Sequence, residues 1–265
     1  MPGVCSTLLT MGWQRYLDII LYRTYAELKA EAQLSYMGYL WWILEPIMNT
    51  LLFYLILTAL LDRPTSGAFA FIIVGAIIWQ WLNASVLTAA NSVVEAGDML
   101  KQIYLPKAVL PLISILTSTW KFLFVFLLLI VSVALAGHPP TMAYLTLPLL
   151  LALEFAVIVG ITLPLAFTMP YFPDARIAVD AFLRSAMLIS GIFFPASQIP
   201  APYRLYFHLN PMADLIEAFR AVLIDGQWPN GVLMTYVTLL AAAGWLVTVG
   251  LHLRLDRSLV KAIHR

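Results

Sequence analysis

Polar side chains that interrupt long apolar stretches are the residues of this sequence with the clearest chemical potential. Lys121 and Glu154 are the only Asp, Glu, Lys or Arg residues between Ala108 and Pro173. If these stretches are membrane helices, ionised groups inside them are costly and usually form a pair, line a water-filled path or carry protons. At about 1.5 Å per helical residue, each lies about 18 Å into its stretch. We expect Lys121 and Glu154 to form an ion pair that locks two antiparallel helices; a proton relay is the alternative.

Two further apolar segments carry polar and aromatic side chains at helical spacing. The first set is Trp42, Glu45, Asn49 and Phe53; the second is Arg176, Asp180, Arg184 and Met187, followed by Phe193 and Phe194. In the second set, Asp180 has an arginine four residues away on each side, so the charges partly neutralise one another. A polar stripe that cannot face lipid must face water or another helix. Both segments are therefore candidates for lining a translocation path, and plain helix contacts are the alternative.

Motifs for catalysis, nucleotide binding or metal binding are absent from the sequence. It contains no GxxxxGK[ST] phosphate-binding loop and no HExxH zinc motif. The four histidines, His138, His208, His252 and His264, fall in different segments, and there is only one cysteine. We therefore expect no catalytic site, no metal site and no cofactor bound by this chain itself.

The composition indicates a membrane protein. Of 265 residues, 62% are apolar and 11% are charged, and the mean hydropathy is +0.88. Soluble domains are about 45–50% apolar and about 25% charged, so this chain has too few polar residues to cover a soluble fold. A soluble enzyme, a nucleic-acid-binding protein and a disordered regulator are excluded. The sequence predicts an all-α polytopic membrane protein.

Breaks at proline, glycine and charge clusters divide the apolar sequence into six expected transmembrane helices within a single domain, residues 1–265. The six span residues 40–61, 70–93, 109–136, 142–169, 177–197 and 231–253. Ten Lys and Arg residues then fall on one side of the membrane and three on the other. Because positive residues favour the cytoplasmic side, both termini are expected to be cytoplasmic. Aromatic residues at the span ends, Tyr39, Trp79, Trp81 and Trp228, are expected to be interface anchors.

Three segments are neither spans nor simple loops. Residues 11–36 predict an amphipathic helix that lies in the membrane interface. Residues 95–107 form a polar cytoplasmic connection. Residues 198–228 predict two short helices that are broken at Asn210-Pro211 and dip into the outer interface.

This arrangement resembles the permeases of type-2 ATP-binding cassette exporters. The segment from Ser35 to Pro46, SYMGYLWWILEP, is similar to the family's S-x-x-G-x-L-W-x-x-L-x-P sequence at the start of span one. Its version from Gly38 onward resembles the capsular polysaccharide branch more than the O-antigen branch. A second match is N-P-(x5)-E-x-x-R-(x5)-G, carried here by Asn210, Pro211, Glu217, Arg220 and Gly226.

The resemblance implies a homodimer in which each copy docks a separate nucleotide-binding ATPase subunit that binds ATP and magnesium. It implies coupling to that subunit by the interface helix and the cytoplasmic connection, through Arg15, Arg23, Lys29, Glu95, Asp98, Lys101, Tyr104 and Lys107. It implies that the two polar stripes line a channel at the homodimer interface. It also implies an outer gate that contains Asn210, Pro211, Glu217 and Arg220.

The resulting expectation is a non-enzymatic permease subunit in the inner (cytoplasmic) membrane of a bacterium, which exports a lipid-linked capsular polysaccharide. Export of O-antigen or teichoic acid is the alternative within the family. A membrane-embedded transferase and an ion-coupled transporter are the alternatives from other classes. A periplasmic adaptor and an outer-membrane exporter are further candidate partners, and no nucleic acid is expected.

Overall fold

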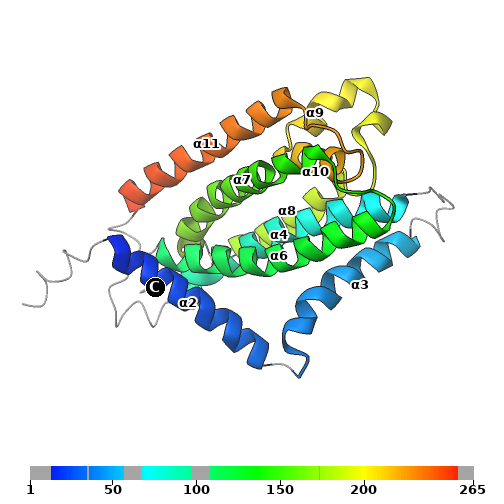
Figure 1. Ribbon diagram of the computed structural model, residues 1–265. Coiled ribbons are helices and arrows are strands. Elements are labelled where there is room, and N and C mark those ends of the chain that lie inside the picture. Colours follow the sequence, from blue (N-terminus) through cyan, green and yellow to red (C-terminus); the bar gives the residue numbers. More distant parts are fainter. Residues whose placement is uncertain (1–12, 35, 57–66, 97–107, 173, 256–265) are drawn as a thin grey trace, which may run out of the picture.

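The computed structural model describes residues 13–34, 36–56, 67–96, 108–172 and 174–255, and regular structure in these ranges is helical (Figure 1). The longer helices are α2 (Trp13–Gln33), α3 (Trp41–Leu55), α4 (Ala68–Glu95), α6 (Val109–Leu135), α7 (Leu147–Thr168), α8 (Ala175–Ile189), α10 (Pro211–Leu223) and α11 (Gly231–Leu255). The short ones are η1 (Gly38–Leu40), η3 (Met142–Thr146), η4 (Met169–Tyr171), η5 (Ala196–Gln198), η6 (Ala201–Tyr203) and α9 (Arg204–His208). The all-helical fold predicted from the sequence is thus observed in the described residues.

Within the described residues, four helices are long and apolar enough to cross a membrane. They cover Phe69–Glu95, Val109–Leu135, Met142–Tyr171 and Gly231–Gly250. These correspond to the second, third, fourth and sixth predicted spans. The amphipathic helix expected over residues 11–36 is α2, and the two short helices expected in residues 198–228 are α9 and α10, which meet at Asn210.

The helix predicted over residues 177–197 is shorter than expected. α8 has 15 residues and ends at Ile189, a length of about 22 Å against a hydrocarbon core of about 30 Å. The helix stops because Gly191 has a backbone φ of +73°, a left-handed conformation that ends an α-helix. α3 also has 15 residues, and residues 57–66, the end of predicted span one, lie outside the described residues.

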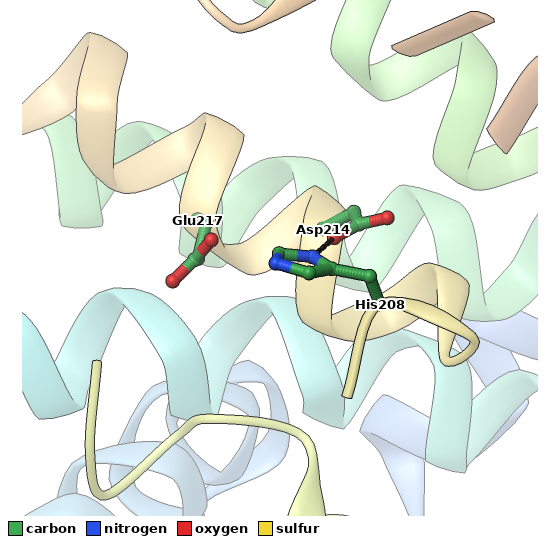
Figure 2. Close-up of side chains that lie close together, drawn as sticks. All are labelled: His208, Asp214 and Glu217. Atoms are coloured by element: carbon green, nitrogen blue, oxygen red, sulfur yellow. Dashed lines mark hydrogen bonds and ion pairs between the residues drawn. The ribbon is translucent and has the colours of Figure 1, made fainter. Parts of the chain in front are cut away.

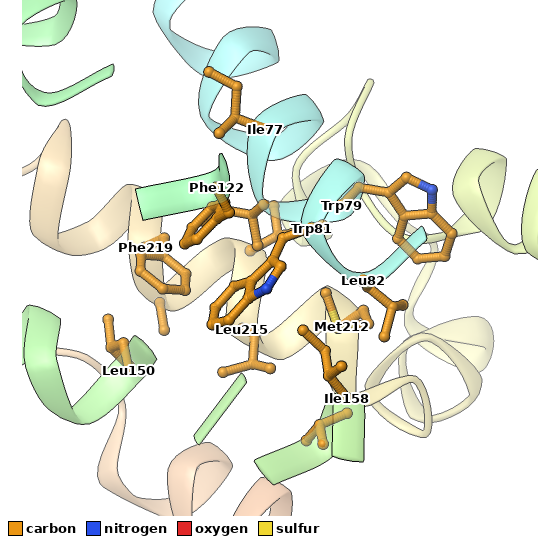
Figure 3. Close-up of a cluster of buried hydrophobic side chains, with 14 of the residues drawn as sticks. Ile77, Trp79, Trp81, Leu82, Phe122, Leu150, Ile158, Met212, Leu215 and Phe219 are labelled. Atoms are coloured by element: carbon orange, nitrogen blue, oxygen red, sulfur yellow. The ribbon is translucent and has the colours of Figure 1, made fainter. Parts of the chain in front are cut away.

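α4 is the centre of the bundle. It packs on α6 and α7, and also contacts α3, α8 and α10. Its side chains meet those of α6, α7 and α10 in one apolar core, in which Trp81 stacks on Phe122 with ring centroids 4.1 Å apart (Figure 3). Trp79 and Trp81 are buried in this core, so the expectation that they anchor the membrane interface is wrong. The indole of Trp81 is held inward by Phe122 and by a hydrogen bond from Nε1 to Thr119 Oγ1 at 3.3 Å.

α11 joins the bundle through α7, on the side away from α3 (Figure 1). The two helices touch backbone to backbone at Gly160 and Gly244, where a Cβ on Gly244 would lie 3.0 Å from Gly160 Cα. Small residues allow such close approach between membrane helices. The indole of Trp245 donates to Ala156 O at 3.2 Å beside this crossing.

We predict that Gly244→Val destabilises the protein by about 1–3 kcal/mol, because the new side chain forces α7 and α11 apart. Gly250→Val on the same helix is the matched control, since a Cβ there meets nothing within 4 Å. Unfolding in mixed micelles measures both. Equal stability of the two variants would contradict a close α7–α11 crossing.

Candidate functional site

A single carboxylate joins three helices at the end of α2. Glu31 on α2 accepts hydrogen bonds from Lys121 Nζ on α6 at 2.9 and 2.8 Å. It also accepts one from Trp42 Nε1 on α3 at 3.3 Å. One turn earlier, Thr117 Oγ1 on α6 donates to Glu27 Oε2 at 3.1 Å. The predicted interface helix is therefore tied to both the first and the third predicted spans, and we call Glu31, Trp42 and Lys121 the Glu31 junction.

The predicted ion pair between Lys121 and Glu154 is wrong. Lys121 is paired with Glu31, and Glu154 is fully buried with neither carboxylate oxygen hydrogen-bonded to any described residue. The prediction assumed that both helices enter the membrane at their first residue. α6 has 27 residues, about 40 Å, and so exceeds the hydrocarbon core by about 10 Å. Its first turns can therefore stand beside α2 instead of α7.

A polar cavity of about 770 Å³ opens next to the Glu31 junction. It is bounded by α2, α4, α6 and α8, and its charged lining residues are Glu27, Glu31, Glu95, Lys121, Arg176 and Asp180. Asn91, Thr117 and Ser118 add amide and hydroxyl groups. The cavity thus brings Glu95, a predicted coupling residue, together with Arg176 and Asp180, predicted channel residues.

The remaining predicted channel residues are divided between α3 and α8. Glu45 is exposed and, with Trp42, lines a second cavity of about 110 Å³, and Asn49 is exposed. Arg184 forms an ion pair with Asp180, as the spacing predicted. Beyond α8, Phe194 packs against Phe207 with centroids 6.2 Å apart, while Met187 and Phe193 are half-buried. The Phe53 side chain lies outside the described residues.

The predicted coupling residues are only partly described. Arg23 and Lys29 are exposed on α2, and Glu95 is exposed at the end of α4. Asp98, Lys101, Tyr104 and Lys107, together with the side chain of Arg15, lie outside the described residues.

At the other end of α6, the residues predicted as a gate hold the chain segment 190–196. The guanidinium of Arg220 donates to three backbone carbonyls: Phe71 O at 3.0 Å, Gly191 O at 2.7 Å and Ile192 O at 2.9 Å. Asn210 Nδ2 donates to Ser190 Oγ at 2.8 Å, and Glu217 Oε1 accepts from the Ala196 N–H at 2.9 Å. We call Asn210, Glu217 and Arg220 the outer clamp.

The outer clamp depends on local structure at both ends of α10. Pro211 begins α10, and the side chain of Asn210 caps it by accepting from the Met212 N–H at 3.1 Å. Arg220 is 5% exposed, and burial lowers its pKa to about 9, an effect that Glu217 partly offsets. The guanidinium fits because residue 75 is glycine: a Cβ there would lie 2.6 Å from Nη2.

His208 lies beside the outer clamp, between two carboxylates (Figure 2). Its Nδ1 is 2.6 Å from Asp214 Oδ1, and one ligand atom each from His208, Asp214 and Glu217 lies within 4.8 Å of the others. Burial raises the pKa of Asp214, and the hydrogen bond with His208 partly offsets this. These three residue types are common metal ligands. Asp214 holds His208 and Glu217 accepts from a backbone amide, while the second oxygen of Asp214 is buried without a hydrogen-bond partner among the described residues.

The match to a known protein family covers most of the described helices. The sequence profile of ABC-2 type transporters matches residues 20–224, from the middle of α2 to the end of α10. The chain belongs to the ABC-2 type transporter family.

Several exporter permeases are similar to this ABC-2 chain. An O-antigen export system permease protein RfbA of Myxococcus xanthus is 25% identical over 218 residues, 82% of this chain and 84% of the relative. An RfbA protein of Klebsiella pneumoniae is 23% identical over 234 residues, 88% of each chain. The polysialic acid transport protein KpsM of Escherichia coli is 26% identical over 230 residues, 86% of this chain and 88% of the relative.

Sequence reasoning missed two residues on which these ABC-2 sites depend. Glu31 was placed on a surface helix, although its spacing of four residues from Glu27 puts both carboxylates on one face. Gly75 gave only the weak signal of a lone glycine in an apolar helix. The contacts of Glu31 with Lys121 and of Gly75 with Arg220 join segments far apart in the chain. The residue pattern of a single sequence does not show which distant segments lie together.

We predict that Glu31→Gln and Lys121→Gln are energetically coupled by about 0.2–1 kcal/mol, the size expected for an exposed ion pair. Double-mutant cycles on unfolding in mixed micelles measure this coupling. The cycle of Lys121→Gln with Glu154→Gln is the control and should give none. If only the cycle of Lys121→Gln with Glu154→Gln shows coupling, Lys121 pairs with Glu154 and not with Glu31.

We predict that Gly75→Ala destabilises the outer clamp, because its methyl group occupies the place of the Arg220 guanidinium and leaves three carbonyls without their donor. The expected loss is about 1–3 kcal/mol. Gly231→Ala is the control, since a Cβ there meets nothing within 4 Å. Amide hydrogen exchange of residues 190–196 should rise in Gly75→Ala; unchanged protection would mean that the clamp does not hold this segment.

Proposed function

We propose that this chain is the membrane-spanning permease subunit of an ATP-driven exporter that moves a polysaccharide across the cytoplasmic membrane of a bacterium. Support comes from the relatives, which include O-antigen export permeases and a polysialic acid transport protein, and each match covers more than four-fifths of the chain. The observation that carries the proposal is the polar cavity that connects the interface helix α2 to α8.

The exporter works as a homodimer of six-span subunits with cytoplasmic termini. α3 and α8 are the first and fifth spans of this proposal, and each packs on α4 within the subunit. Both leave polar groups exposed, including Asn49 on α3 and Arg184 on α8. Polar groups on the outside of a membrane subunit need water or a partner. A second copy that faces these helices encloses them as the walls of a hydrated channel.

ATP is bound by a separate nucleotide-binding subunit, and the exposed residues of α2 and the connection at 95–107 are its docking surface. The Glu31 junction then passes movement of α2 to α3 and α6. Its ion pair is exposed, with side-chain exposures of 25% for Lys121 and 47% for Glu31, and such pairs are weak. A weak, directional contact suits a joint that forms and breaks in each transport cycle.

The substrate is a hydrated, lipid-linked polymer whose hydroxyl groups match the carboxylate, amide and hydroxyl lining of the cavity. O-antigen and capsular polymers share this chemistry, and the relatives support the two equally. A periplasmic adaptor and an outer-membrane exporter extend the same path for a capsular polymer.

We predict that the chain co-purifies with the ATPase encoded beside it, and that a lipid-linked polysaccharide changes ATP turnover of the complex in lipid vesicles. Glu31→Gln should leave assembly intact but remove most of that response, because the contact between α2 and α6 is weakened. Gln33→Ala, also exposed on α2, is the control. If no ATPase associates, the transferase and ion-coupled alternatives return.

A further inference from the structure

We propose that the loop between α10 and α11 forms a carbohydrate-binding site that accepts neutral or amino sugars, with Trp228 as its stacking platform. This site rests on the proposed function, in which it lies on the outer side of the membrane, where the polymer leaves. It consists of Trp228, Asp225, Gln227 and Asn230, which line one cavity with Glu217 of α10.

The cavity has a size that suits a short stretch of polymer. Its volume is about 390 Å³, within the range of about 300–1,000 Å³ found for small-molecule sites. Phe71, Pro195, Leu233 and Met234 contribute apolar surface to its lining. The site therefore combines an apolar surround with a few polar groups, as ligand pockets do.

Trp228 supplies the aromatic surface that sugar rings require. Its side chain is 63% exposed although it lies in the cavity wall. One face of a pyranose ring carries mainly C–H groups, which pack against the electron-rich face of an indole. Lipid anchoring also uses an exposed tryptophan, but it does not require polar partners around a cavity.

The polar groups beside Trp228 have the chemistry of hydroxyl recognition. Asp225, Gln227 and Asn230 are all exposed. A carboxylate accepts two hydroxyl hydrogens, and an amide both donates and accepts. Asn230 uses Oδ1 to accept from the Val232 N–H at 3.0 Å at the start of α11, which fixes the orientation of its amide.

The loop backbone is held in place before any ligand binds. His138 Nδ1 lies 3.0 Å from Ile224 O, and Tyr144 Oη donates to Leu223 O at 3.3 Å. The Gln227 N–H donates to Ala221 O at 2.8 Å. Gly226 has a φ of +65°, and a Cβ there would lie 2.8 Å from Thr141 Cγ2. A loop fixed in this way loses little conformational entropy on binding.

The charge of the cavity indicates which sugars it takes. Three carboxyl groups line it, those of Asp214, Glu217 and Asp225, against one cation, Arg220. That guanidinium is already bonded to three backbone carbonyls. Asp214 is buried against His208, and Glu217 accepts from the Ala196 N–H, so Asp225 is the exposed carboxylate of the cavity. An acidic sugar would be repelled by this carboxylate, whereas a neutral or amino sugar would not.

Binding to the full-length chain in lipid nanodiscs tests the site. The probes are maltohexaose and chitohexaose as neutral sugars, hexagalacturonate as the acidic one, and the polymer released by mild acid from the cells that make it. Calorimetry should show that at least one neutral probe binds more tightly than hexagalacturonate. Trp228→Ala should weaken this binding at least about tenfold, the effect of losing one aromatic partner. Trp120→Ala is the matched control, because Trp120 is 56% exposed on α6 and lies outside the cavity.

Asp225→Asn separates hydroxyl recognition from charge. It should weaken the binding of the neutral probes severalfold, because a carboxylate that accepts hydroxyl hydrogens is lost. It should also reduce the difference in affinity between the neutral probes and hexagalacturonate, because a repulsive charge is removed. Equal binding by wild type and Trp228→Ala, or failure of every neutral probe and the released polymer to bind, would overturn the proposal. A lower amount of Trp228→Ala protein in the membrane with unchanged affinity would show that Trp228 is a lipid anchor, which also overturns it.

Export and ATP turnover distinguish failure of this site from failure of the proposed function. If the polymer changes ATP turnover but Trp228→Ala binds and exports like wild type, the site is wrong and the exporter stands. If Trp228-dependent sugar binding is found but no ATPase associates, the exporter mechanism is wrong and the site stands.

Discussion

The end of the bundle that contains α10 depends on where one buried cation, Arg220, finds its hydrogen-bond acceptors. Arg220 is buried, and its guanidinium donates to the carbonyls of Phe71, Gly191 and Ile192. The carbonyls of Gly191 and Ile192 are available because α8 has ended at Ile189. The carbonyl of Phe71 lies in the first turn of α4 and accepts the guanidinium with a second lone pair. The guanidinium therefore links the chain just after the end of α8 to the first turn of α4, and it needs the space that glycine leaves at position 75.

The contacts of α2 with α3 and α6 are weaker than those of Arg220, and this difference bears on which helices can move. The guanidinium of Arg220 is buried, and its loss would remove the donor from the non-helical carbonyls of Gly191 and Ile192 in a low-dielectric environment, which is costly. The Glu31 junction borders the cavity of about 770 Å³, where a partly exposed ion pair contributes little. A helix attached by such contacts can move while the clamp stays formed. Movement driven from the α2 side would thus pivot on the outer clamp.

The sequence predicted the helices better than their contacts. The lengths of the apolar stretches predicted the bounds of α4, α6, α7 and α11 to within a few residues. This works because a helix in a membrane must form all of its backbone hydrogen bonds internally. Apolar length overestimated the fifth helix, whose end is decided by Gly191 and by an arginine 29 residues later in the chain. The N-P and E-x-x-R residues were found as a group, but their role as a clamp on segment 190–196 required the fold. The predicted partner of Lys121 was wrong because the position of a residue along its helix does not determine which neighbouring helix it faces. Lys121 faces Glu31 on α2, not Glu154 on α7.

The two polar cavities share an excess of acidic residues, which bears on the substrate. At the inner cavity, four carboxyl groups face Lys121 and Arg176, and both cations have acidic neighbours in the same lining. At the outer cavity, three carboxyl groups face an arginine that is already bonded to backbone. A polyanion passing between these cavities would meet carboxylates at both ends, in a protein region where their charges are poorly screened. A polymer of neutral or amino sugars would instead use the same carboxylates as hydroxyl and ammonium acceptors. In the proposed exporter, the charges of the two cavities therefore favour a neutral or amino-sugar polymer over an acidic one.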